Sequence, residues 1–232
     1  MSKKRFSAKI NLSSRLKGVS FHMKNSEYNQ YRKTGIELNG KILHTVDKKE
    51  LMSAAKLLGM FEGNSIVFES EAESDYLYDF VLNEIIDKNE TVVERYKERN
   101  HRIPAIEKEI LEALGSSYTS LYKVVSVSSE TNSLELKDLL NARDELITIT
   151  DLSFSQTAKP GLIIFTRLIS LPQFTIASGA NFLFSENHEA YLVRQYKKQM
   201  KKAPGKNEAA KRFITFFQLN RRDGLLTRFQ QQ

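Results

Sequence analysis

Five short segments rich in apolar and β-branched residues follow one another in the second half of the chain, and they constrain its fold more than any other feature. They cover residues 120–126, 133–139, 146–151, 161–170 and 173–178. The connections between them are short and polar, which is typical of antiparallel strands joined by tight loops. We therefore predict a small five-strand β-domain, folded as a meander or as a barrel-like sheet.

The residues before these segments have mostly helical spacing. Apolar side chains recur every three or four residues in the ranges 47–59, 71–86, 91–99 and 103–114, which predicts four helices. Asp47 and Glu50 have the spacing of a capping box at the start of the first of them. Residues 35–44 differ, because Asn39-Gly40 between apolar residues predicts a β-hairpin with a type I′ turn.

Two more helices are predicted after the β-domain. Ser185 suits the N-cap of the first, Pro204-Gly205 ends it, and Asn207 suits the N-cap of the second. We predict an α+β protein with a helical N-terminal half, a small five-strand β-barrel-like or meander domain and two C-terminal helices. The expected regions are a basic arm over 1–24, a mainly helical acidic region over 25–115, the β-domain over 116–185 and a basic helical region over 186–232.

Charge is distributed unevenly along the 232 residues, whose formal net charge is +7. Residues 1–24 carry +7, residues 25–190 carry −9 and residues 191–232 carry +9. Such asymmetry indicates contact with nucleic acid or with an anionic membrane. The alternative is that the basic ends fold onto the acidic body and partly neutralise it.

Several classes of site are absent from the sequence. It contains no cysteine, which excludes disulfides, thiolate zinc sites, iron–sulfur clusters and cysteine nucleophiles. The four histidines lack metal-ligand spacing, and no phosphate-binding loop or nucleophile elbow is present. Glu135 and Lys137 have the E-x-K spacing of a nuclease core, but no acid lies on a preceding strand to share a metal. We therefore predict no catalytic residues, no metal site and no cofactor.

The basic C-terminal region supplies the candidate binding residues. Arg194, Lys197, Lys198 and Lys201 recur every three or four residues, so a helix would place them in one stripe. Lys202 follows directly, and Arg221 and Arg222 follow the next predicted helix. Lysine and arginine in such a stripe hold phosphates. The simpler interpretation is a solvated helix face, which most charge runs are.

Residues 91–184 resemble a group of uncharacterised bacterial proteins. The likeness lies in a helix followed by a β-domain with three motifs: Asp138-Leu139-Leu140, Asp151-Leu152-Ser153, and the G-x-x-x-F-x-R pattern from Gly161 to Arg167. The resemblance implies the same domain arrangement and a bacterial origin, and it implies no activity. Some members of that group end in a cysteine-rich zinc tail, a feature that a chain without cysteine does not share.

Three classes of function stay open. The first is a non-enzymatic protein that binds nucleic acid or a ribonucleoprotein through its basic ends, and it is the one we favour. The second is a protein-interaction or scaffold module, including self-association into a homo-oligomer. The third is an enzyme whose site is assembled across the regions. No apolar run is long enough to span a bilayer, and we expect a cytoplasmic protein.

Overall fold

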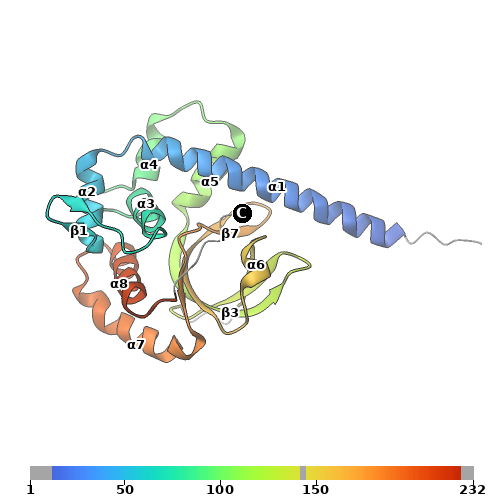
Figure 1. The fold of residues 1–232 in the computed structure, drawn as a ribbon. Coiled ribbons are helices and arrows are strands. Elements are labelled where there is room, and N and C mark those ends of the chain that lie inside the picture. The colour runs from blue at the N-terminus through green and yellow to red at the C-terminus, as the bar shows by residue number, and fades with distance from the viewer. Residues whose placement is uncertain (1–11, 142–144, 226–232) are drawn as a thin grey trace, which may run out of the picture.

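The computed structural model describes residues 12–141 and 145–225 as an α+β fold, which confirms the predicted class. Figure 1 shows helices gathered on one side of a curled sheet, with α1 lying across both and extending past the sheet. The elements in chain order are α1 (Leu12–Leu43), α2 (Lys48–Leu58), β1 (Phe61–Glu62), β2 (Ser65–Ile66), α3 (Glu73–Asn83), α4 (Val92–Arg99), α5 (Ala105–Gly115), β3 (Tyr118–Ser128), β4 (Ser133–Asp138), β5 (Ile147–Thr150), α6 (Phe154–Thr157), β6 (Ile163–Ser170), β7 (Thr175–Ala177), β8 (Phe182–Phe184), the 3₁₀ helix η1 (Glu186–His188), α7 (Glu189–Gln199), the 3₁₀ helix η2 (Met200–Lys202) and α8 (Glu208–Asp223).

Side-chain caps fix the starts of three predicted helices. The Asp47 side chain accepts a hydrogen bond from the backbone N–H of Glu50 at 2.8 Å and begins α2. Thr91 and Glu94 form a reciprocal capping box at the start of α4. The side chain of Asn207 accepts from the backbone N–H of Ala210 at 2.8 Å and begins α8, as its position in the sequence predicts.

The prediction of a hairpin over residues 35–44 is wrong, because α1 continues through this range without interruption. A type I′ turn needs a positive φ at both central residues, and neither Asn39 nor Gly40 has one. Tyr28, Tyr31, Leu38 and Ile42 are buried at helical spacing along the same side of α1. Packing of that stripe against the body outweighs the local turn preference of Asn-Gly.

The main sheet is antiparallel, with the strand order β5-β4-β3-β6-β7. The five predicted strands are all present, and β8 is an additional strand that pairs with the first half of β6, while β7 pairs with the second half. Strands β5 and β7 lie at opposite ends of this order and still contact each other, so the sheet curls into a half-barrel. The sheet is thus closer to the barrel-like alternative than to a flat meander.

Both faces of the sheet are covered. One face carries a small apolar cluster that includes Tyr122, Val124 and Ile164 and is covered by Phe154 of α6. The other face packs on the helices, where Phe165 of β6 stacks on Phe216 of α8 with ring centroids 4.5 Å apart. This second core also contains Phe80 of α3, so it joins the acidic helical region, the sheet and the C-terminal helices.

The ends of the chain are described in part. Residues 1–11 of the predicted basic arm lie outside the described residues, and residues 12–24 form the first part of α1. None of the helices in the described ranges is both long and apolar enough to cross a membrane.

Candidate nucleic-acid interface

Most buried charges in the described part of the chain are engaged in structural ion pairs. Arg95 of α4 donates to both carboxylate oxygens of Glu50 at 2.9 and 2.8 Å. Arg167 of β6 donates to Asp79 at 3.0 Å and to Glu84 at 2.6 Å. Burial raises the pKa of Glu84, and the Arg167 charge opposes that rise. These pairs connect elements to one another, as buried charges must be paired to be tolerated.

Over residues 25–141 and 145–225, whose side chains the structure describes, no group of three or more His, Asp or Glu side chains is placed to hold a metal ion. The structure also shows the surroundings of Glu135 and Lys137, the pair with E-x-K spacing in the sequence. Glu135 of β4 accepts a hydrogen bond from the hydroxyl of Ser126 at 2.7 Å, and Lys137 is exposed.

The C-terminal cations divide into two groups according to their surroundings. Helix α7 lies against the body through Leu192, which is fully buried, and through Tyr196, whose ring stacks on Phe216 at 5.2 Å. The side chains on its other side are exposed, namely Arg194, Lys197 and Lys198, followed in η2 by Lys201 and Lys202. We call these five residues the α7 stripe. The sequence-predicted stripe therefore exists as an exposed surface.

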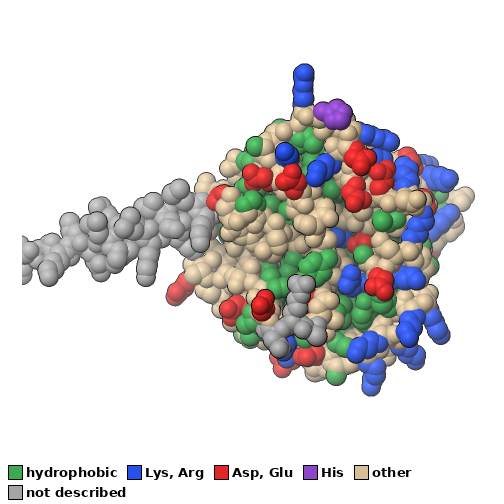
Figure 2. Space-filling view, turned by 180° about the vertical axis from the view of Figure 1, so that it is seen from behind, with side chains coloured by type: hydrophobic (Ala, Val, Ile, Leu, Met, Phe, Trp, Pro, Cys, Tyr) green, Lys and Arg blue, Asp and Glu red, His purple; other side chains and the backbone are tan. Residues whose placement is uncertain are grey.

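The α7 stripe lacks acidic partners among the residues that the structure describes. None of its five side chains is within ion-pair distance of a described carboxylate. At 1.5 Å per residue, the positions from Arg194 to Lys202 span about 12 Å of helix axis. Figure 2 shows Lys and Arg side chains gathered along the side of the molecule that carries α7 and η2. Five positive charges within this length attract polyanions.

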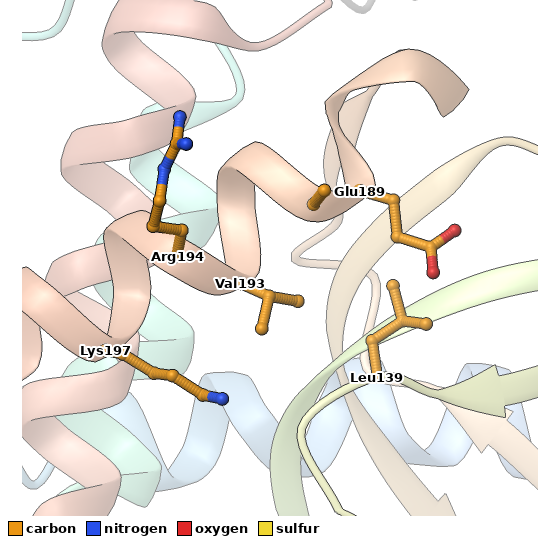
Figure 3. Close-up of a pocket in the computed structure, with 6 residues that line it drawn as sticks. Leu139, Glu189, Val193, Arg194 and Lys197 are labelled. Carbon is orange, nitrogen blue, oxygen red and sulfur yellow. The ribbon is translucent and has the colours of Figure 1, made fainter.

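A hollow of about 570 Å³ lies beside the first turns of α7. Its lining combines apolar and charged side chains: Leu139, Glu189, Ala190, Val193, Arg194 and Lys197. Figure 3 shows Val193 of α7 facing Leu139, which follows β4, while Lys197 extends along the helix toward the same space. The stripe thus borders a surface depression at one end.

Glu189 is the acid of this hollow, and it is engaged by Lys123 of β3 at 2.9 Å. The hydrogen bond to Glu189 raises the pKa of Lys123. Sequence reasoning missed this pair because Lys123 and Glu189 are 66 positions apart and belong to different elements. The negative charge of Glu189 therefore lies beside one end of the α7 stripe.

The other two predicted binding residues lie elsewhere and have structural partners. Arg221 of α8 donates to both carboxylate oxygens of Glu73 at 2.7 Å each and to the carbonyl oxygen of Gly59 at 3.0 Å. Arg222 donates to Asp223 at 2.9 Å and to the hydroxyl of Tyr191 at 2.5 Å. The structure therefore brings together five of the seven predicted residues, and it places Arg221 and Arg222 in contacts that hold α8 to its neighbours.

A comparison with models of protein families places the chain. One model, described as a family of unknown function (DUF7986), matches residues 23–230. The chain belongs to the DUF7986 family. This membership confirms the resemblance to a group of uncharacterised proteins and extends it well beyond residues 91–184. No match was found among curated proteins or among solved structures.

Proposed function

We propose that this DUF7986 member is a non-enzymatic protein that binds nucleic acid, alone or within a ribonucleoprotein, through the α7 stripe. The observation that supports this function is the set of five exposed cations on α7 and η2, without a described acidic partner. Cations that neutralise phosphates release condensed counterions, which drives binding independently of sequence. The proposal also places the protein in a bacterial cytoplasm, where nucleic acid is accessible to it.

A binding assay with charge-matched variants tests the proposal. Fluorescence anisotropy with a labelled duplex of about 25 base pairs should give saturable binding by the wild type. The salt concentration is about 50 mM, because non-specific phosphate contacts are strong at low salt. The triple variant Lys197→Gln, Lys198→Gln, Lys201→Gln should weaken binding by at least tenfold. The matched control is Lys49→Gln, Lys88→Gln, Lys97→Gln, which removes the same charge from exposed lysines outside α7 and η2. Equal loss in both variants, or no binding by the wild type, would exclude the α7 stripe as the interface.

A second candidate function, protein interaction, has an observation of its own. Val67 and Phe68 are 40% and 43% exposed in the loop before α3. They lie next to a hollow of about 510 Å³ that is lined by Phe68, Glu69, Ser70, Glu71 and Ser74. Exposed apolar side chains with an acidic rim suit a basic protein partner or a second copy of the chain. Sedimentation velocity of Phe68→Ser beside the wild type measures whether this surface supports self-association.

A further inference from the structure

We propose that the α7 stripe contacts the phosphate backbone of a nucleic-acid duplex and does not read bases, an inference that rests on the proposed function. Two kinds of side chain recognise bases: forked or amide groups that bind base edges, and aromatic rings on which bases stack. The described contacts of α7 show whether its side chains of each kind are free to bind a base.

Base-edge readers on α7 are few. Four of the five residues in the stripe are lysines, which present a compact charge and no planar fork, so they suit phosphates better than base edges. The two glutamines of α7 are hydrogen-bonded to each other, with the Nε2 of Gln199 donating to the Oε1 of Gln195 at 3.0 Å. Arg194 is therefore left as the exposed side chain of α7 with the geometry for a bidentate base contact.

The aromatic rings of α7 are engaged by the body of the protein. The hydroxyl of Tyr191 donates to Asp223 at 2.9 Å, and its ring contacts that of His188. Tyr196 stacks on Phe216 with an interplanar angle of 20°. Over residues 25–141 and 145–225, the exposed aromatic side chains are Phe68 and Tyr78, which belong to the loop before α3 and to α3 itself. The stripe consequently offers no stacking platform of the kind that proteins use for single strands.

The spacing of the charges favours a duplex as well. A duplex presents one phosphate charge per about 1.7 Å of axis, whereas each strand presents one per about 3.4 Å. Over the roughly 12 Å of the stripe, a duplex therefore carries about seven phosphate charges, whereas a single strand of the same rise carries about three or four. A duplex therefore offers the α7 stripe about twice the phosphate charge per length that a single strand does, which favours the duplex.

Anisotropy titrations of the wild type with four probes test this inference. The probes are two DNA duplexes of unrelated sequence, an RNA duplex of the same length, and one DNA single strand. We expect the two DNA duplexes to bind within about twofold of each other, with a log–log salt slope of about −4 to −5 for five phosphate contacts. The single strand should bind at least fivefold more weakly, with a slope near −2.5. The duplex that binds more tightly, DNA or RNA, identifies the source of the phosphates.

Two results would overturn the inference. One is a preference of more than tenfold for one duplex sequence over the other. The second is tighter binding of the single strand than of both duplexes. Either result would leave the proposed function standing, because nucleic acid would still bind, with a different mode of recognition. The proposed function itself fails when no probe binds. It also fails when the triple variant at Lys197, Lys198 and Lys201 and the charge-matched control both bind as tightly as the wild type.

Discussion

At the scale of single residues, side chains of the same charge have two roles that the sequence cannot separate. Arg221 and Lys197 are both cations of the basic C-terminal region, yet Arg221 is bound by the buried carboxylate of Glu73 while Lys197 is exposed. The partner of Arg221 lies 148 positions earlier in the chain, on α3. A pattern along the sequence therefore overestimates the number of free cations, because an acidic partner elsewhere in the chain decides which of them stay available to a ligand.

The role of Arg221 leads to a stability prediction. Arg221→Gln removes a bidentate bond to Glu73 and leaves this buried carboxylate without its cation, which should lower the free energy of unfolding by about 2–3 kcal/mol. Guanidinium denaturation measures the loss. The matched control is Arg222→Gln, because Arg222 is about half exposed and pairs with its neighbour Asp223, so the expected cost is below about 1 kcal/mol. Equal effects of the two changes would contradict the assigned role.

Tyr31 gives a prediction about alkaline pH. Its hydroxyl donates to Glu109 of α5, and this hydrogen bond, together with burial, raises the pKa of Tyr31 to about 12. An unfolded tyrosine ionises near pH 10, so the unfolded state loses its proton first and the stability supplied by Tyr31 declines as pH rises from about 10 to about 12. The difference in unfolding free energy between wild type and Tyr31→Phe should be constant below pH 9 and shrink above pH 10. A constant difference up to pH 11.5 would contradict this.

At the scale of elements, the sequence predicts most of the fold because local signals agree with the packing. The helices whose N-caps the sequence predicts at Asp47 and Asn207 are present, as are the five predicted strands. Ser185 begins the 3₁₀ helix η1 without a side-chain cap, and α7 begins at Glu189. Strand β8 was not predicted, because three residues are too few to establish a strand period and its pairing depends on β6. The failure at residues 35–44 arises from a turn dipeptide inside a helix that is held by tertiary contacts.

Gly40 tests the assignment of this segment to α1. Glycine inside a helix is less favourable than alanine by roughly 0.5–1 kcal/mol, and a Cβ at Gly40 would meet nothing within 4 Å. Gly40→Ala should therefore raise the free energy of unfolding by about 0.5–1 kcal/mol. In a type I′ hairpin the same change would destabilise the protein, because that turn needs a positive φ at Gly40. Urea denaturation of the two proteins distinguishes these outcomes by their sign.

Glu189 tests how far the interface extends along α7. Its carboxylate borders the hollow beside Arg194 and Lys197 and is paired with Lys123. Glu189→Gln removes a negative charge beside the bound phosphates and frees Lys123, so duplex affinity should rise severalfold, in line with about 1 kcal/mol for one charge at contact distance in water. Stability should change little, because the Lys123 pair is at the surface. Unchanged or weaker binding at low salt would place the phosphates elsewhere.

At the scale of the whole molecule, the separation of charge along the chain is only partly cancelled by folding. Some cations of the C-terminal region fold onto the acidic helices, since Arg221 bonds to Glu73 and Lys206 donates to the backbone carbonyl of Asp87. The α7 stripe does not, and it remains exposed at the surface of the fold (Figure 2). The hypothesis that basic residues fold onto the acidic body therefore applies to the cations of α8. The nucleic-acid-binding hypothesis depends on the cations of α7.

The most direct test of this account is the salt dependence of duplex binding by the wild type and by the Lys197→Gln, Lys198→Gln, Lys201→Gln variant. Each lost phosphate contact should reduce the slope of log K against log salt by about 0.9, so the two slopes should differ by about 2.7. The charge-matched variant at Lys49, Lys88 and Lys97 should keep the wild-type slope. Identical slopes for the wild type and the α7 variant would contradict the claim that α7 holds the nucleic acid.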